Sequence, residues 1–263
     1  MSFSHDVKSE LVAYSAEARE SGQMKPCCMQ TETYALFLFC RSFSVKEMGL
    51  KTDHKCIADR YASAVREMTG HKPKREKTAG GKYRVIVEDP VDRQAILSEF
   101  GYSGNEVNRR LNTGILQDEG CRSALFRGAF LTAGTITDPE KDYHMEFVLS
   151  TKSLCMDLCD LLTEADLSPK YVQRNGAHVI YFKDSESVED LLTLMGATSS
   201  SLELMGTKMY KDMRNRVNRR LNFENANSTR TFDAAYRQIK AIEYIEQKRG
   251  LESLPPELRE LAK

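Results

Sequence analysis

The sequence has no tryptophan, no long run of uncharged apolar residues and no excess of charge of either sign. A membrane-spanning helix needs about 20 mostly apolar residues, so none is expected, and the polar stretch 1–15 lacks the apolar core of a signal peptide. Lysine plus arginine and aspartate plus glutamate number 38 each, so total charge neither requires nor excludes a polyanionic partner. No glycine-rich phosphate loop is present, and seven scattered cysteines are typical of a reducing compartment. We expect a cytoplasmic protein without disulfides, cofactors or membrane contact.

The chain carries the same order of signals twice, in residues 54–102 and 152–197. Each stretch predicts an amphipathic helix, two strands joined by a tight turn, and a second helix. The turns are Gly80-Gly81 and Asn175-Gly176, dipeptides that tolerate the positive φ of a two-residue hairpin. Asp89 and Asp184 open the closing helices as N-caps. We predict a duplicated unit.

An apolar helix rich in small residues precedes each unit, at 31–43 and 121–134. Ala35, Gly128 and Ala129 would let the backbones of these two helices approach closely at a pseudo-two-fold axis. The alternative is two ordinary helical hairpins of similar composition. Beyond the second unit, the pattern predicts separate helices at 198–221 and 229–249.

Several motifs resemble one bacterial family. They are the opening SFSHDVKSEL, the Cys27-Cys28 pair, FRGAFLTAGTITDPEKDYHMEF at 126–147 and KDMRNRVNRRLNFENANSTRT at 211–231. Together they resemble the WhiA family, whose members are regulators associated with cell division and sporulation in Gram-positive bacteria. WhiA proteins join a degenerate, two-motif LAGLIDADG domain, related to homing endonucleases, to a C-terminal helix-turn-helix domain.

The resemblance implies an α+β fold with a pseudo-two-fold, homing-endonuclease-like domain over residues 1–222, its two repeats covering about 31–103 and 121–197. Residues 223–263 would then form a helical linker and the first residues of a truncated helix-turn-helix domain. We expect that domain to be missing, because the similarity stops near Leu254.

The nuclease chemistry of this fold is expected to be lost. LAGLIDADG nucleases hold a divalent metal through an acidic residue at the eighth position of each motif, and here that position falls on Ala133 and on about Cys40. Alanine has no ligand atom, and a thiol is a poor ligand for Mg²⁺. We predict no catalytic residue and no metal site. A residual nuclease using Asp138 or Glu140 remains an alternative, although both follow a turn-forming segment.

Double-stranded DNA is the partner that the resemblance implies, held by the hairpin strands in the major groove. Between Arg66 and Arg84, seven cations face two carboxylates, and period-two alternation places Lys82 and Arg84 on one strand face. A second basic run follows at 211–220. The DNA-binding residues we predict are Lys72, Lys74, Arg75, Lys77, Lys82, Arg84, Lys170, Arg174, Lys183, Lys211, Arg214, Arg216, Arg219 and Arg220. The alternative for each basic run is a solvated surface or ion pairs within the domain.

Other candidate ligands are assigned to the core. Cys155 and Cys159 lie four residues apart on an apolar helical stripe, and the adjacent Cys27 and Cys28 are not expected to chelate one tetrahedral ion. We therefore predict a non-catalytic DNA-binding regulator of cell division or sporulation, located at the nucleoid, with other regulatory proteins as further partners. The alternative is a protein-interaction scaffold that depends on the helix-turn-helix for DNA targeting.

Overall fold

The computed structural model describes residues 2–104, 106 and 108–262 and divides the chain into two units. Unit 1 spans Met1–Lys208 and unit 2 spans Met209–Lys263. One helix, α8 (Thr198–Arg249), begins in the first and ends in the second. None of the helices in the described part of the chain combines the length and the hydropathy that a membrane crossing requires.

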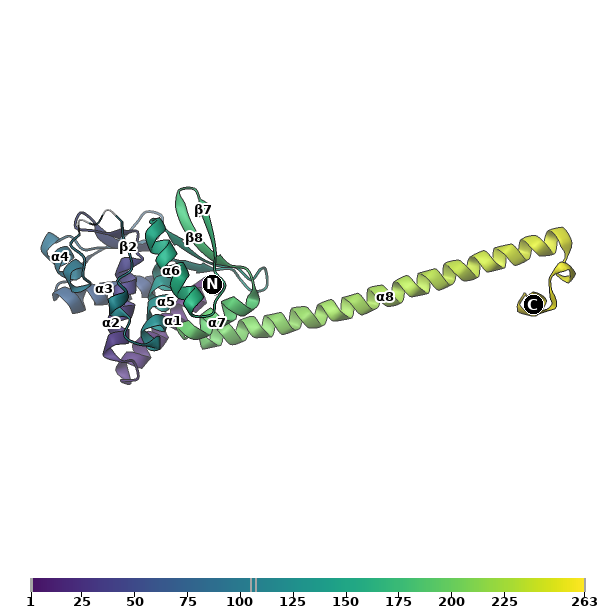
Figure 1. Cartoon of the computed structure of the whole chain (residues 1–263), viewed down its shortest axis with the longest axis horizontal. Helices are drawn as coiled ribbons and strands as arrows, with labels where there is room; N and C mark the ends of the chain where they lie inside the picture. Colours follow the sequence, from purple (N-terminus) through teal and green to yellow (C-terminus); the bar gives the residue numbers. More distant parts are fainter. Residues whose placement is uncertain (1, 105, 107, 263) are drawn as a thin grey trace. The chain divides into compact units, whose positions relative to one another are not determined.

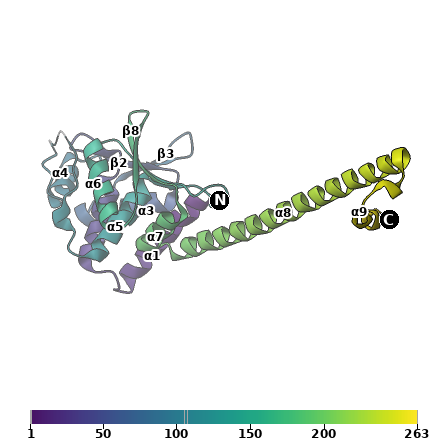
Figure 2. The ribbon, with the colours of Figure 1, turned by 45° about the vertical axis from the view of Figure 1, so that its right-hand side comes forward.

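Unit 1 is built of helices and two small antiparallel sheets. Its helices before α8 are α1 (Phe3–Glu20), α2 (Pro26–Leu38), α3 (Lys55–Thr69), α4 (Pro90–Glu99), α5 (Glu119–Ala133), α6 (Lys152–Glu164) and α7 (Ser185–Met195), with a 3₁₀ turn, η1 (Thr113–Ile115). Its strands are β1 (Ser42–Phe43), β2 (Met48–Thr52), β3 (Lys74–Lys77), β4 (Tyr83–Ile86), β5 (Gly134–Ile136), β6 (Met145–Leu149), β7 (Lys170–Arg174) and β8 (Ala177–Phe182). Helices α1, α2 and α5 lie on one side of the sheets, and the β7–β8 hairpin stands out from the unit (Figures 1 and 2).

The predicted duplication is confirmed. The order α2-β1-β2-α3-β3-β4-α4 recurs as α5-β5-β6-α6-β7-β8-α7. The sheets have matching strand orders, β1-β2-β4-β3 and β5-β6-β8-β7. Both residues of the Asn175-Gly176 turn have positive φ, as predicted. The predicted two-residue turn is wrong for the first hairpin, where only Gly81 has positive φ and three residues separate Thr78 from Lys82, whose backbones are hydrogen-bonded. Asp89 and Asp184 cap α4 and α7 through backbone amides of Val91 and Ser187.

Each repeat also contains a first hairpin that the sequence analysis did not predict. Strands β1 and β5 are two and three residues long, too short to show an alternating pattern. The prediction of helix, hairpin and helix is therefore incomplete, because each sheet is made of two hairpins. The N-terminal helix α1 was not predicted either. The Glu10 carboxylate on α1 accepts hydrogen bonds from the Ser199 and Ser200 amides and so caps the start of α8.

Helices α2 and α5 form the centre of unit 1 and approach closely. A Cβ atom added to Gly128 on α5 would lie 2.6 Å from the Ala35 Cβ and 2.8 Å from the Glu32 carbonyl oxygen on α2. Glycine at position 128 is therefore what permits this spacing, as predicted. Residues Tyr34–Phe39 are all buried, which explains why this part of α2 is apolar on every side.

The C-terminal helices were predicted as two, and this is wrong. Helix α8 continues without a break from Thr198 to Arg249. The segment 222–228 contains three asparagines and one serine but neither proline nor glycine, and asparagine or serine costs a helix only about 0.7 kcal/mol each or less. A second 3₁₀ turn, η2 (Leu251–Ser253), and a short helix, α9 (Pro256–Leu261), follow.

Candidate nucleic-acid interface

The outward face of the first sheet carries cations from three strands. Residues directly opposite one another share a face, so the pairs Lys51–Arg84 and Glu76–Arg84 define one row across β2, β4 and β3. Lys74 pairs with Ile86 and occupies the next row of the same face. Arg84 is exposed, whereas its neighbour Val85 is buried against the helices. The predicted division of β4 into a buried and an outward face is confirmed.

Acidic side chains neutralise this face. The outward cations are Lys51, Lys74, Lys82 and Arg84, and the acids beside them are Glu47, Asp53, Glu76 and Glu88. The nitrogen–oxygen distances are 3.0 Å for Lys74–Glu76, 3.1 Å for Lys74–Glu88, 3.1 Å for Lys82–Asp53 and 3.7 Å for Arg84–Glu47. The excess of cations counted along residues 66–84 is therefore offset by carboxylates from outside that segment.

Two of the predicted hairpin cations point to the opposite face. Arg75 forms an ion pair with Asp59 on α3, and the Lys77 ammonium lies 5.6 Å from the centroid of the Tyr83 ring. Lys72 is exposed in the loop before β3. The structure thus gathers Lys74, Lys82 and Arg84 on the outward face and separates Arg75 and Lys77 from them.

The outward face of the second sheet keeps a positive excess. Lys170 and Glu146 both pair with Tyr181, so these three residues form a row across β7, β8 and β6. Arg174 shares the face and lies 2.9 Å from the Glu146 carboxylate, while the Lys183 ammonium lies 5.7 Å from the Tyr181 ring centroid. Arg174 therefore pairs with Glu146, while the charge of Lys170 acts on the Asp184 carboxylate next to Lys183, so three cations share this area with two acids.

The densest basic segment belongs to unit 2. Arg214, Arg216, Arg219 and Arg220 are exposed on α8, and Lys211 is half-exposed. The carboxylates within this stretch and its next turn are Asp212 and Glu224, and Glu224 lies 2.8 Å from Arg220. Within the described ranges, Arg214, Arg216 and Arg219 have no ion-pair partner. We call residues 211–220 the basic segment.

The positions at which a LAGLIDADG nuclease carries its acids hold no carboxylate. Cys40 is buried just beyond the end of α2, and its thiol donates a hydrogen bond to the Leu36 carbonyl at 2.9 Å. Ala133 is the last residue of α5. A cavity next to these helix ends is lined by Cys40, Arg41, Arg109 and Thr132 among others, and no described lining residue is acidic.

An arginine occupies the helix end instead. The Arg109 guanidinium donates to the carbonyl oxygens of Cys40 at 2.8 Å and Leu38 at 3.1 Å, and it lies 5.7 Å from the Phe43 ring centroid. These contacts satisfy carbonyl groups at the C-terminus of α2 with a permanent positive charge. Arg109 was not among the predicted site residues, because it lies in an irregular segment with no periodic pattern.

Asp138 and Glu140 form a turn. The Asp138 carboxylate accepts a hydrogen bond from the Glu140 amide at 2.9 Å, and the Asp138 carbonyl accepts from Lys141 and Asp142. This arrangement agrees with the reading of both residues as a loop cap. Cys155 is buried and Cys159 half-buried in the core on α6, as expected.

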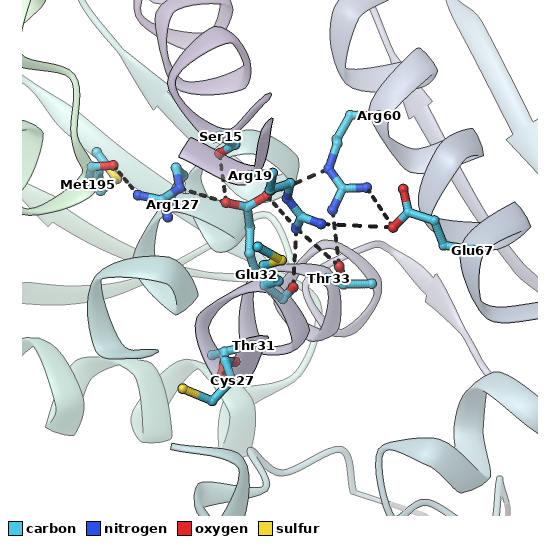
Figure 3. Close-up of polar contacts among 11 residues, drawn as sticks. Ser15, Arg19, Cys27, Thr31, Glu32, Thr33, Arg60, Glu67, Arg127 and Met195 are labelled. Atoms are coloured by element: carbon cyan, nitrogen blue, oxygen red, sulfur yellow. Dashed lines mark hydrogen bonds and ion pairs between the residues drawn. The ribbon is translucent and has the colours of Figure 1, made fainter. Parts of the chain in front are cut away.

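A buried ionic network joins α1, α2, α3 and α5 behind the sheets (Figure 3). The Glu32 carboxylate on α2 is fully buried and accepts from Ser15 at 2.7 Å, Arg127 at 2.8 Å and Arg19 at 3.2 Å. The Arg60 guanidinium lies 3.6 Å away. Burial acts to raise the pKa of Glu32, but the arginines outweigh it and hold this pKa below its ordinary value.

Arg127 is buried at one end of this network and has further partners within the chain. Its guanidinium donates to the Met195 carbonyl at 2.6 Å and lies 4.9 Å from the Tyr14 ring centroid. With only 3% of Arg127 exposed, this cation is not offered to a ligand. The network fixes the relative position of the central helices.

Two similar repeats around a close helix pair define a duplicated LAGLIDADG-like domain followed by a basic helix. Comparison with known proteins agrees with this class. The family model described as the WhiA LAGLIDADG-like domain matches residues 122–214, and the model described as the WhiA C-terminal HTH domain matches residues 217–263.

The chain belongs to the WhiA family. It is 34% identical over 280 residues to a probable cell division protein WhiA of Alkaliphilus metalliredigens, covering all of this chain and 86% of that relative. It is 36% identical over 281 residues to the protein of the same name from Alkaliphilus oremlandii, covering 85% of it. A crystal structure of full-length DUF199/WhiA from Thermatoga maritima superimposes with a TM-score of 0.62 at 21% identity, over all of this chain and 85% of that one.

The helix-turn-helix match corrects one expectation. We expected that domain to be missing, but its family model covers residues 217–263, which include most of α8 and all of α9. The expectation failed because the match begins at residue 217, well before Leu254, where we had placed the end of the similarity.

Proposed function

We propose that the chain is a non-catalytic, double-stranded-DNA-binding regulator of transcription that acts on genes of cell division or sporulation. The basic segment of α8 carries this proposal. It places five cations within ten residues at the junction of the regions matched by the two WhiA family models. Cations at helical spacing reach successive phosphates, and phosphate contacts supply most of the affinity that does not depend on sequence.

The geometry of unit 1 supports a lesser part for the sheets. On the second sheet, the outward cations Lys170, Arg174 and Lys183 outnumber the acids beside them, Glu146 and Asp184. Those of the first sheet must exchange their carboxylate partners for phosphates. A cation that must give up a carboxylate partner contributes less binding free energy to a phosphate contact than a cation without an ion pair. We therefore assign the main DNA contact to α8.

The absence of cleavage rests on the ends of α2 and α5. The side chains at the expected metal positions are Cys40 and Ala133, and the Arg109 guanidinium adds positive charge beside them. A fixed cation at this place repels a divalent metal and attracts phosphate. The scaffold would then hold DNA without polarising it for hydrolysis.

Affinity for a duplex, measured by fluorescence anisotropy across a salt series, tests the proposal. Each neutralised phosphate contributes about −0.9 to the slope of log affinity against log salt. Replacement of Arg214, Arg216 and Arg219 by alanine is expected to reduce that slope by up to about 2.7 units. The matched control removes three cations on helices of unit 1, Lys55, Arg122 and Lys152, and should leave the slope close to that of the unmodified chain.

A second candidate function is a protein-interaction scaffold, favoured by the neutralised outward face of the first sheet. A flat salt response of the unmodified chain, or equal slopes for the triple variant and its control, would support this alternative and refute the proposed role of the basic segment.

A further inference from the structure

The N-terminal ends of α2 and α5 bring three thiols and one carboxylate together. Cys27 and Cys28 lie in the first turn of α2, Asp118 is the N-cap of α5, and Cys121 lies in the first turn of α5. Their ligand atoms all lie within 4.8 Å of one another. We call these four residues the thiol cluster. Cys27 and Cys28 were not expected to share one ion, and Cys121, which joins them in this cluster, is 93 residues from Cys28 in the sequence.

The duplication explains how the cluster forms. Cys28 and Cys121 are each the third residue of their helix, and Lys25 and Asp118 are the corresponding N-caps. The axis that brings α2 against α5 therefore brings the two equivalent cysteines face to face. The Lys25 ammonium lies 2.7 Å from Asp118 Oδ2, while Asp118 Oδ1 accepts a hydrogen bond from the Cys121 amide at 2.9 Å and lies 3.7 Å from the Cys28 sulfur.

Two of the distances between ligand atoms match those of one tetrahedral ion, and the others are within 4.8 Å. A zinc ion with bonds of about 2.3 Å to sulfur and about 2.1 Å to oxygen sets two sulfur ligands about 3.8 Å apart and a sulfur and an oxygen about 3.6 Å apart. The Sγ atoms of Cys28 and Cys121 are 3.9 Å apart, and Cys28 Sγ is 3.7 Å from Asp118 Oδ1. A disulfide needs about 2.05 Å between sulfur atoms, which this arrangement does not approach.

The surroundings favour a bound cation with thiolate ligands. The N-terminal dipole ends of both helices favour thiolates, whereas burial and the neighbouring thiols raise the pKa of Cys28 to about 12, so a bound cation would be needed to hold all three sulfur atoms as thiolates. Cys28 and Cys121 are buried, whereas Cys27 and Asp118 are partly exposed and leave a path for an ion to enter. Three thiolates exclude Mg²⁺ and Ca²⁺, which prefer oxygen, and suit Zn²⁺.

We propose that Cys27, Cys28, Asp118 and Cys121 bind one Zn²⁺ ion that fastens the N-termini of the two central helices together. The four protein ligands complete the coordination sphere, so the site is structural, with no open position for a substrate. Lys25 holds the second carboxylate oxygen and orients Asp118 from outside the ligand set. The site goes beyond the proposed DNA binding and does not depend on it.

Metal content of the whole chain, purified under reducing conditions without a metal-binding tag, tests the site. Inductively coupled plasma mass spectrometry should find about one zinc per chain. Cys28→Ser and Cys121→Ser should lower the zinc content at least tenfold. The matched control, Cys159→Ser, removes a half-buried thiol outside the cluster and should retain the ion.

Cobalt provides a second measurement that requires no variant. Adding Co²⁺ to the metal-free chain should produce the visible ligand-field bands of a tetrahedral site and thiolate-to-cobalt charge-transfer absorption, both abolished by one equivalent of Zn²⁺. The proposal is overturned by a chain that holds no zinc and gives no such bands, by a Cys28–Cys121 disulfide under reducing conditions, or by equal zinc loss in Cys159→Ser.

Discussion

Replacement of Glu32 by glutamine should destabilise the chain strongly. The substitution keeps the size of the side chain but removes the negative charge that Arg127, Arg19 and Arg60 share. Arg127 is only 3% exposed and would keep one carbonyl and one aromatic ring as partners. Breaking a buried ion pair from one side costs about 3–5 kcal/mol, since it leaves a buried charge uncompensated. We expect the free energy of unfolding to fall by that amount.

Urea denaturation followed by circular dichroism measures this change. The matched control is Glu67→Gln, which removes a carboxylate 3.7 Å from Arg60 and 3.9 Å from Arg19 but is 54% exposed. Exposed pairs contribute about 0–1 kcal/mol, so the control should lie close to the unmodified chain. The double variant Glu32→Leu with Arg127→Met should be more stable than Glu32→Gln, because it removes the carboxylate together with Arg127, the most deeply buried of its three arginine partners. A loss below about 1 kcal/mol for Glu32→Gln, with an unchanged slope against urea, would refute this reasoning.

Three further outcomes follow from the same contacts. The pKa of Glu32 in the folded chain is below its unfolded value of about 4.3, so the stability that its charge contributes is complete above that pH and is lost as the pH falls through the folded pKa. In urea titrations at acid pH, the difference in unfolding free energy between the unmodified chain and Glu32→Gln should therefore become smaller. A difference that does not change with pH would contradict the lowered pKa of Glu32. Gly128→Ala should lower the free energy of unfolding by about 1–3 kcal/mol, because the added Cβ would collide with α2. The control Gly206→Ala has open space around the added Cβ and should stabilise α8 by up to about 1 kcal/mol. Equal effects of the two variants in thermal unfolding would argue against the close contact of α2 and α5. Glu10→Ala should lower stability by about 0.5–2 kcal/mol through loss of the cap on α8, and no shift of the melting temperature would show the cap to be unimportant.

The duplicated architecture was readable from sequence because local signals repeat. The Gly80-Gly81 and Asn175-Gly176 turns, the Asp89 and Asp184 caps and the small residue at 128 each act through backbone geometry, which a single sequence reveals. Strands β1 and β5 escaped prediction because pairing with β2 and β6, rather than any pattern of their own, makes them strands.

The candidate sites were harder to predict because they depend on residues distant in sequence. The cations Lys82 and Arg84 could be placed on one face of β4, but their carboxylate partners come from other segments. Arg109 reaches the end of α2 from an irregular segment, and Cys121 meets Cys28 only through the packing of the repeats. Tertiary contacts of this kind produce no periodic pattern in the sequence.

Supercoiled plasmid incubated with the chain in Mg²⁺ or Mn²⁺ distinguishes binding without cleavage from hydrolysis. We expect a retarded plasmid on a native gel, and fully supercoiled plasmid once the protein has been digested away. Nicked or linear plasmid that depends on the metal and disappears in Asp138→Asn, or a plasmid that is never retarded, would contradict this expectation.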